Sequence, residues 1–481
     1  MRQLNFLTPE ALYGVAASRR IEGIAQRQLA AHTLMQRAGL ALAKLALALA
    51  PHSRLIWVPC GPGNNGGDGM EAAMHLKRWG KHPVVSWLGS AALAPPDACA
   101  SYTRAKEAGV VFADEPPSHV DLVMDALLGI GARPCAPMPQ SQMANWIDLI
   151  NTCSVPVLAV DLPTGLDADT GVASPYWVAA THTLCLLTLK PGLFTAQGRD
   201  AAGTVWFDDL GTGQATEAPD AWLAGMSMAS TRLHATHKGS YGDVAVVGGA
   251  PGMTGAALLA ASAALHGGAG RVFVCLHEGG SLTVDTTQPE LMFRASLATD
   301  AMTVVCGCGG GHLIAQHLPR LLTSPSPLVL DADALNAIAA DSVLQALSCT
   351  RTAPTVWTPH PLEAARLLAC STADVQANRL TSAQDIARRY GGIVVLKGSG
   401  TVIAQTGKTS VINPTGNAKL ATAGTGDVLA GMIGAKLASG CDAFEAACHA
   451  VHQHGQMADQ WPDHQALSAS MLTNHAVRRN I

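Results

Sequence analysis

Short apolar runs alternate with helical patterns in the first part of the chain. The runs typical of strands are Leu55–Val58, Val84–Trp87, Leu122–Met124, Val157–Val160 and Leu184–Leu187. Helical patterns lie between them, at Met70–Trp79, Ala98–Ala108 and Met138–Ile150. Because strands that alternate with helices form βαβ units, this order predicts a mostly parallel sheet covered on both faces.

A second series of the same kind follows. Its predicted strands are Val244–Val247, Val272–Leu276, Val304–Cys306, Leu328–Leu330, Thr355–Trp357 and Ile393–Leu396, and its last helices are Asp427–Ala438 and Phe444–Gln460. The intervening segment Gly211–Ser230 is rich in small residues, has no strand pattern and is predicted to be a linker. We therefore expect an α/β protein with two different domains, residues 1–215 and 228–481.

The composition suits large buried cores and small-molecule chemistry. The 481 residues are 48% hydrophobic and only 14% charged, with a formal net charge of -4. The chain has no long run of basic residues, so a nucleic-acid partner held through its phosphates is not expected. Backbone amides bind phosphate without net positive charge, so a phosphate-bearing small ligand remains compatible with this composition.

The twelve cysteines are scattered and include no Cys-x-x-Cys pair. The tightest spacing, Cys306-Gly-Cys308, offers at most two metal ligands. We therefore expect free thiols of a cytoplasmic enzyme rather than a zinc site or a disulfide framework. No signal peptide is recognisable, and the apolar run Ala38–Ala50 is shorter than the roughly 20 residues that span a bilayer. This run is predicted to be a packed helix.

A glycine-rich segment, Gly61–Gly69, follows the first predicted strand and precedes a helix. Backbone N–H groups at such a turn attract phosphate, and the helix dipole adds to this attraction. The Asn-Asn-Gly-Gly sequence is also typical of a tight turn, which is the alternative interpretation. The position directly after a strand favours a ligand site.

Two further segments, Met124–Gly131 and Val160–Asp167, also end predicted strands. Ligands of parallel sheets bind beyond the carboxyl ends of the strands, so the polar residues of the three segments are expected to meet in one crevice. These residues are Asn65, Asp125, Asp161 and Thr164. An aspartate at a strand end is often only a helix cap, but three such segments together favour shared chemistry.

These segments resemble the NAD(P)H-hydrate epimerase family, as do Leu34–Gly39 and Thr188–Leu193. The resemblance covers nearly all of the first half and implies a Rossmann-like three-layer domain. It also implies a potassium ion held by oxygens of Asn65, Asp125 and Thr164, and Asp161 as the residue that transfers a proton at the hydrated carbon. The residues that it implies in binding the hydrated nucleotide are Asn64, Asn65, Gly66, Gly67, Asp68, Gly129, Ile130, Gly131, Ala132, Arg133, Pro134 and Cys135.

The second half contains Asn413–Asn417 and then Ala423–Asp427, directly before a helical pattern. The amides of Gly424–Gly426 are expected to face an anion from the helix N-terminus, with Asp427 in the first turn. This arrangement suits phosphoryl transfer, because the amides stabilise the transferring group while the carboxylate accepts the proton of the attacking hydroxyl. In the alternative interpretation, Asp427 only interacts favourably with the helix dipole.

Other polar residues also follow predicted strands of the second half. Lys397–Thr401 contains glycines that allow close approach of a ligand to the backbone. His360 and Glu363 follow another strand and are well placed to touch a ligand. Asp331 and Asp333 are predicted either to bind Mg²⁺ through water or to cap the helix that follows them.

This half resembles the ADP/ATP-dependent NAD(P)H-hydrate dehydratase family, whose fold is ribokinase-like. The resemblance runs from His237–Gly242 through Met253–Ala257 to His454 and Gly455. It implies ADP as the phosphoryl donor, with ATP as the alternative, and it implies that Asp427, the catalytic candidate, contacts the hydrated nucleotide. Mg²⁺ is the expected cofactor. The residues that it implies in binding are Ala256, Gly309 and His360 for the hydrated nucleotide, and Lys397, Gly398, Ser399, Gly400, Thr401 and Gly426 for the adenine nucleotide.

The chain departs from this family at two places. Gly307–Gly311 reads Gly-Cys-Gly-Gly-Gly where the family usually has Gly-Pro-Gly-Leu-Gly. A more flexible loop is expected there, and with it weaker substrate binding. Lys419 stands where a small residue is common, and is predicted to be either a phosphate contact or a solvated surface charge.

Together the two resemblances imply an enzyme that repairs hydrated NADH and NADPH. The first half would interconvert the R and S hydrates, and the second half would dehydrate the S form at the expense of ADP, giving AMP and phosphate. Two alternatives stay open: a ribokinase-like small-molecule kinase, and a first half that binds a partner without catalysis. We expect a cytoplasmic homo-oligomer, by analogy a tetramer, with no nucleic-acid or membrane partner.

Overall fold

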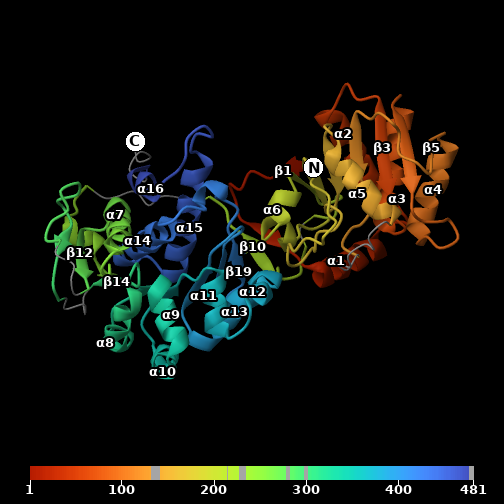
Figure 1. The fold of residues 1–481 in the computed structure, drawn as a ribbon. Helices are drawn as coiled ribbons and strands as arrows, with labels where there is room; N and C mark the ends of the chain where they lie inside the picture. The colour runs from red at the N-terminus through yellow and green to blue at the C-terminus, as the bar shows by residue number, and fades with distance from the viewer. Residues whose placement is uncertain (132–140, 214, 227–233, 278–281, 297–301, 476–481) are drawn as a thin grey trace. The chain divides into compact units, whose positions relative to one another are not determined.

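A computed structural model of the chain describes residues 1–131, 141–213, 215–226, 234–277, 282–296 and 302–475 (Figure 1). The chain forms two compact units, Met1–Leu223 and Ala224–Ile481, and both are α/β as predicted. Within the described ranges, no helix combines the length and apolar character needed to cross a bilayer. The cysteines in these ranges are free thiols, as expected.

The first unit is built on an eight-stranded sheet in the order β1-β9-β8-β7-β6-β3-β4-β5, parallel except for β1. In chain order, its strands are β1 (Arg2–Gln3), β3 (Leu55–Cys60), β4 (His82–Trp87), β5 (Val111–Phe112), β6 (Leu122–Asp125), β7 (Val157–Val160), β8 (His182–Leu186) and β9 (Thr204–Asp208). Its helices are α1 (Val15–Gln28), α2 (Thr33–Leu49), α3 (Asn64–Arg78), α4 (Pro96–Glu107), α5 (Gln142–Thr152), the short α6 (Gly198–Ala201) and the 3₁₀ turn η1 (Pro191–Phe194). All five strands predicted for this half are present.

Both faces of this sheet are buried, which explains the continuous apolar runs. Along β3, Ile56 and Val58 pack into a core with α2 and α3. Trp57 points to the opposite face, as alternation along a strand requires, and packs edge-on against Trp146 of α5 at 5.9 Å between ring centroids. The predicted three layers are therefore confirmed, and the apolar run within α2 is a packed helix.

The strands of the second unit follow the order β13-β12-β11-β14-β15-β16-β17-β18-β19, parallel from β13 to β17 and antiparallel beyond. They are β11 (Asp243–Gly248), β12 (Arg271–Leu276), β13 (Met292–Phe293), β14 (Thr303–Cys306), β15 (Leu328–Leu330), β16 (Thr355–Trp357), β17 (Ile393–Leu396), β18 (Val402–Gln405) and β19 (Ser410–Ile412). The helices are α7 (Thr254–His266), α8 (Leu318–Thr323), α9 (Ala332–Ala340), α10 (Ser342–Thr350), α11 (Pro361–Leu368), α12 (Thr372–Ala377), α13 (Arg379–Tyr390), α14 (Thr425–Ala438), α15 (Ala443–Asp459) and α16 (Ala469–His475). Short 3₁₀ turns are η2 (Lys238–Tyr241), η3 (Gly311–Gln316) and η4 (Ala418–Leu420).

Two cores cover the two faces of this second sheet. One contains residues of α7, α14, α15 and α16, and the other contains residues of α8 to α13. The two cysteines of the Cys306-Gly-Cys308 sequence belong to different cores, Cys306 to the second and Cys308 to the first. They therefore do not act together as a metal-binding pair.

Two predicted boundaries are wrong. Helix α3 begins at Asn64 and not at Met70, so the glycine-rich segment forms its first turns. Glycine is needed there for packing, because a Cβ on Gly66 would lie 2.1 Å from the carbonyl oxygen of Gly61. The predicted linker also contains a strand, β10 (Ala221–Leu223), which pairs with β2 (Glu10–Leu12) in the first unit. Its three residues are too few to show a periodic pattern.

The turn between β3 and α3 offers a matched pair of glycines for a stability test. A Cβ on Gly61 would lie 1.7 Å from the carbonyl oxygen of Leu127, whereas a Cβ on Gly63 would meet nothing within 4 Å. Gly61→Ala must displace backbone, so we expect it to lower the free energy of unfolding by about 1–3 kcal/mol. Gly63→Ala should lower it by less than about 1 kcal/mol, because the added Cβ meets no clash and the change only replaces glycine by the less favourable alanine at the N-cap of α3. Equal midpoints of urea unfolding for the two variants, followed by fluorescence, would contradict this packing.

Candidate active sites

In the first unit, residues that follow the carboxyl ends of β3, β6, β7 and β8 line one cavity of about 460 Å³. The predicted site residues that line it are Asn64, Asn65, Asp68, Gly129, Ile130, Gly131 and Asp161. Gly66 and Gly67 instead lie buried in α3, where each allows a close approach to neighbouring atoms. The predicted residues Ala132, Arg133, Pro134 and Cys135 lie outside the described residues.

Asp161 is held at the wall of this cavity by a buried lysine. Its backbone is left-handed, with φ at 65°, directly after β7, and only 8% of the residue is exposed. Its Oδ1 accepts hydrogen bonds from Lys190 Nζ at 2.5 Å and from the amide of Leu186 at 3.1 Å. A strained backbone at a ligand cavity is typical of a residue whose position matters for function.

The sequence pattern gives Lys190 no role of its own beyond its place in the segment Thr188–Leu193. Its side chain is buried, and Nζ also donates to the carbonyl oxygen of Leu186 at 2.8 Å. Burial acts to lower the pKa of Lys190, but the Asp161 charge outweighs it and the pKa is raised. Lys190 therefore stays protonated and keeps the carboxylate of Asp161 in place. The sequence feature that could have revealed this role is a single charged residue, Lys190, in an otherwise uncharged segment directly after a strand.

Two further carboxyl groups face the same cavity. Glu22 comes from α1, a helix that the sequence analysis did not predict, and Asp68 comes from α3. Burial, and then the nearby charge of Asp161, raise the pKa of both groups. The cavity therefore combines Asp161, which is paired with a lysine, and two carboxyl groups whose pKa values are raised above their usual range, a combination that suits acid–base chemistry.

Asp125 and Thr164 are fully buried and bind each other. The Thr164 hydroxyl donates to Asp125 Oδ1 at 2.7 Å, and the Thr164 amide donates to Oδ2 at 2.8 Å. Burial raises the pKa of Asp125 to about 6, although the hydrogen bonds that it accepts from Thr164 and Leu127 act in the opposite direction. The pair is linked to the cavity wall, since the amide of Leu128, which lines the cavity, donates to the Thr164 hydroxyl at 3.0 Å.

The surroundings of Asp125 fit a hard cation such as K⁺. The carboxylate and hydroxyl oxygens match the ligand preference of such an ion, whose charge would compensate the buried carboxylate. The side-chain amide of Asn65 lies beside Gly129, and its buried Nδ2 has no hydrogen-bond partner among the described residues. Because the oxygen and nitrogen of an amide side chain are exchanged by a flip, this orphaned position can present an oxygen.

In the second unit, the N-terminus of α14 carries the predicted catalytic residue. Gly424 precedes the helix with φ at 90°, and Asp427 lies in the first turn, as predicted. The buried His454 of α15 donates from Nε2 to the carbonyl oxygen of Thr425 at 2.9 Å. Burial lowers the pKa of His454 to about 4, so this histidine is neutral and fixes the start of α14 as a hydrogen-bond donor.

Lys397 lies between this helix and two buried carboxylates. Its Nζ is 2.7 Å from Asp331 Oδ1 and 4.0 Å from Glu363 Oε2. A Cβ on Gly426 would lie 3.2 Å from the same Nζ, so the cation sits against the first turn of α14. Burial raises the pKa of Glu363 to about 7, and burial and the Asp331 charge raise that of Asp427 to about 6.

The helix-capping interpretation of the two aspartates after β15 is wrong. Asp331 makes no side-chain cap of α9, and instead accepts hydrogen bonds from Lys397 and from the Thr358 hydroxyl. Asp333 accepts a hydrogen bond from the amide of Gly311 at 2.8 Å. This bond ties α9 to the loop in which the chain departs from the family sequence.

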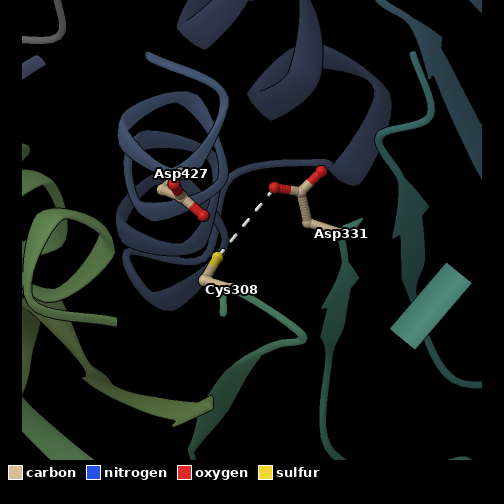
Figure 2. A group of neighbouring side chains, drawn as sticks. All are labelled: Cys308, Asp331 and Asp427. Carbon is tan, nitrogen blue, oxygen red and sulfur yellow. Dashed lines mark hydrogen bonds between the residues drawn. The ribbon is translucent and has the colours of Figure 1, made fainter. Parts of the chain in front are cut away.

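That loop, Gly307–Gly311, is anchored at several points. Cys308 is fully buried, and its Sγ lies 4.0 Å from Asp331 Oδ2 (Figure 2). Burial and the charge of Asp427 raise the pKa of this thiol well above its usual value, so it is protonated. A Cβ on Gly309 would lie 2.9 Å from the Cβ of Ala256, so these two predicted residues are side by side.

The other predicted residues of the second unit lie around the same strand ends. His360 caps α11 through Nδ1, which accepts from the amides of Leu362 and Glu363, and its side chain is 46% exposed. Lys397–Thr401 forms the turn after β17, with positive φ at Gly398 and Gly400. Gly398 packs against the guanidinium of the buried Arg379.

Two other segments differ in how they relate to this cluster: the amide of Asn413 donates to the carbonyl oxygen of Thr401 at 2.9 Å, which joins Asn413–Asn417 to the turn after β17, whereas Lys419 forms its contact elsewhere. Asn413–Asn417 is fastened to α15, since the Thr415 hydroxyl donates to the carbonyl oxygen of His452 at 2.9 Å. Lys419 Nζ forms an ion pair with the exposed Asp463 at 2.6 Å, which favours the interpretation as a surface charge.

Comparisons with known proteins agree with this arrangement. A family model described as YjeF-related protein N-terminus matches residues 31–192, and one described as NAD(P)H-hydrate dehydratase matches residues 244–480. The bifunctional NAD(P)H-hydrate repair enzyme of Escherichia coli K12 is 36% identical over 461 residues, which cover 90% of this chain and 85% of the relative. The ADP-dependent (S)-NAD(P)H-hydrate dehydratase of Neisseria meningitidis serogroup B is 42% identical and covers 50% of this chain and 84% of its own length.

Among solved structures, one of the ADP/ATP-dependent NAD(P)H-hydrate dehydratase from Bacillus subtilis, co-crystallised with ATP and Mg²⁺, is 30% identical. It covers 52% of this chain and 92% of its own length, with a TM-score of 0.46. The two family matches and the two α/β units agree with the predicted Rossmann-like and ribokinase-like folds.

The buried pair of Lys190 and Asp161 is tested by removing its cation. Lys190→Met leaves Asp161 buried without a charged partner, so we expect a loss of about 3–5 kcal/mol in the free energy of unfolding at pH 8. The loss should be smaller at pH 5, because an unpaired buried carboxyl group takes up a proton and becomes neutral. The double variant Lys190→Met/Asp161→Asn should recover most of it. Equal losses for the single and double variants, measured by urea unfolding, would contradict the pairing.

Proposed function

The chain belongs to the family of bifunctional NAD(P)H-hydrate repair enzymes, and from this premise we propose how its residues divide the two reactions. The family pairs an epimerase domain with an ADP-dependent dehydratase domain. We assign epimerisation of the R and S hydrates to residues 1–215 and dehydration of the S hydrate to residues 228–481. The observation that carries the assignment is a carboxylate at a ligand-facing strand end or helix start in each unit, Asp161 and Asp427, with a largely buried lysine nearby.

In the epimerase domain, Asp161 transfers the proton at the hydrated carbon. Its support is the fixed position beside the cavity and the neighbouring Glu22 and Asp68, whose raised pKa values let them exchange a proton with it. The hydrated nucleotide is bound by Asn64–Asp68 at the start of α3 and by Gly129–Gly131. The amides at that helix start suit a phosphate of the nucleotide.

We assign a K⁺ site in this domain to Asn65, Asp125 and Thr164. When bound, the ion would supply a positive charge that stabilises negative charge on the nucleotide phosphate. The residues themselves contribute the buried oxygens of Asp125 and Thr164, which are fixed relative to the cavity wall through the Leu128 amide.

In the dehydratase domain, the hydroxyl of the S hydrate attacks the terminal phosphoryl group of ADP and releases AMP. Asp427 accepts the proton of that hydroxyl, and the amides of Gly424–Gly426 stabilise the charge on the transferring group. Lys397, against Gly426, adds a positive charge at the same place. Elimination of phosphate then restores the nicotinamide ring. The pKa of about 6 keeps Asp427 ionised at neutral pH while still able to accept a proton.

The remaining contacts in this domain follow from the turns around α14. The hydrated nucleotide lies against Ala256, Gly309 and His360, and the adenine nucleotide lies against the turn Lys397–Thr401. Asp331 and Asp333 would hold Mg²⁺, and the ion would supply charge neutralisation for the nucleotide phosphates. We further propose ADP rather than ATP as the donor, a homotetramer, and a cytoplasmic location.

Reciprocal variants test the division of labour. Asp161→Asn should slow epimerisation by about 10²–10⁴-fold and leave dehydration of the pure S hydrate unchanged, because general acid–base catalysis is worth that much. Asp427→Asn should abolish dehydration and leave epimerisation unchanged. Dehydration is followed by recovery of NADH absorbance, and epimerisation by chromatographic separation of the hydrates. Full-rate epimerisation by Asp161→Asn would remove the role of Asp161.

The raised pKa of Asp427 predicts where the dehydration rate falls on the acid side of its pH profile. Below a pH of about 6 the carboxyl group is protonated and cannot accept the hydroxyl proton, so kcat/KM for the S hydrate should fall tenfold per pH unit. Glu363, whose pKa is about 7, could also cause such a fall in rate. If Asp427 is the cause, the Glu363→Gln variant should still lose activity near pH 6. A rate that stays constant down to pH 5, or a fall in rate that disappears in Glu363→Gln, would contradict the assignment to Asp427.

A further inference from the structure

Three side chains from three separate segments of the second unit point toward one another in Figure 2. Cys308 follows β14, Asp331 follows β15, and Asp427 lies in the first turn of α14. One ligand-type atom of each, the sulfur and two carboxylate oxygens, lies within 4.8 Å of the other two. Their separation in the sequence hid this cluster from the sequence analysis, which considered only the Cys306-Gly-Cys308 spacing.

The cluster is oriented as a ligand set and is open on one side. Cys308 is fully buried, and its sulfur faces Asp331 Oδ2 at 4.0 Å. The other oxygen, Asp331 Oδ1, already accepts from Lys397 and Thr358, so Oδ2 is the oxygen that turns to the cluster. Asp427 is only partly buried, so the cluster borders solvent on the side of Asp427.

The donor set selects the kind of cation. A hard ion such as Mg²⁺ takes oxygen ligands, whereas one sulfur with two carboxylate oxygens suits Zn²⁺ or another thiophilic divalent ion. Zn–S bonds of about 2.3 Å and Zn–O bonds of about 2.0 Å place ligand atoms roughly 3–4 Å apart, so shifts of about 1 Å would close the cluster.

The charges balance around such an ion. With the thiol ionised, the three ligands carry three negative charges, which match the two of a divalent cation and the one of Lys397. Glu363 and Asp333 are the other acidic groups near this cluster, and the Glu363 carboxylate faces Lys397 at 4.0 Å. The positive charge of Lys397 is therefore offset by the acidic groups around it, so Lys397 does not prevent a cation from binding.

We propose that Cys308, Asp331 and Asp427 form a binding site for a thiophilic divalent cation, Zn²⁺ or its analogue Cd²⁺, whose occupancy stops dehydration. On binding, the Cys308 thiol forms an Sγ–metal bond and its proton leaves to solvent. The ion also holds the Asp427 carboxylate, which then cannot accept the proton of the substrate hydroxyl. The inhibition rests on the function proposed above for Asp427, whereas the binding does not.

Binding is tested with Cd²⁺ and the full chain, by the ultraviolet charge-transfer band of a cadmium–thiolate bond. All proteins carry Cys349→Ser and Cys370→Ser, which remove two exposed thiols. The test variant Cys308→Ser keeps a small hydrogen-bonding side chain but has no thiolate. The matched control Cys306→Ser changes a buried cysteine of the other core. We expect Cys308→Ser to lose the band and to bind Cd²⁺ at least about tenfold more weakly, and Cys306→Ser to bind as the parent does.

A second variant, Asp427→Asn, guards against a misfolded Cys308→Ser protein and should also weaken Cd²⁺ binding at least about tenfold. Thermal unfolding followed by circular dichroism checks the fold of each variant. If Cys308→Ser and Asp427→Asn bind Cd²⁺ as tightly as the parent, the cation lies elsewhere and the site is overturned.

Inhibition is measured as NADH recovery from the S hydrate with ADP and Mg²⁺ at buffered concentrations of free Zn²⁺. The parent and Cys306→Ser should be inhibited alike, and the residual activity of Cys308→Ser should need at least about tenfold more Zn²⁺. An absent thiolate band overturns the metal site and leaves the role of Asp427 intact. A band with an undiminished rate at saturating Cd²⁺ overturns the inhibition and, with it, the role of Asp427 as proton acceptor.

Discussion

In each unit, a largely buried lysine–aspartate ion pair at the carboxyl ends of parallel strands holds the side chains of the candidate site in position. In the first unit Lys190 holds Asp161, and in the second Lys397 holds Asp331. A buried charge without its partner is costly, so such a pair allows few side-chain positions. The pairs serve different ends: Asp161 itself faces the ligand cavity, whereas Asp331 and Lys397 form the surroundings in which Asp427 works.

Parallel sheets made much of this predictable. Burial on both faces produces continuous apolar runs, so the main strands of both halves were found from the sequence with small errors at their ends. Ligands of such sheets bind beyond the strand ends, so the order of strands and polar segments along the chain was enough to single out the regions around Asn65, Asp161 and Asp427. The chemistry attached to these segments came from family resemblance, because aspartates and glycines at strand ends suit many reactions.

What the sequence did not reveal depends on contacts between distant segments. Glu22 enters the first cavity from a helix that was not predicted, and Lys190 acquires its role only by meeting Asp161. The glycines of Asn64–Gly69 predict a loop, because glycine is a poor helix former. They nevertheless lie inside α3, where neighbouring atoms leave no room for a Cβ at Gly66. The loop around Cys308 was expected to be more flexible, but its anchors, Asp331 and Asp333, are not apparent from its own sequence.

The central claim is that one chain completes a repair in two steps, each in its own unit. Its most direct test supplies the R hydrate of NADH alone, with ADP, Mg²⁺ and K⁺, and follows NADH absorbance together with released phosphate. The account predicts complete recovery of NADH with equimolar phosphate, because the R hydrate must first be epimerised and only the S hydrate is dehydrated. An R hydrate that stays unchanged, or a stable phosphorylated product without NADH, would contradict it.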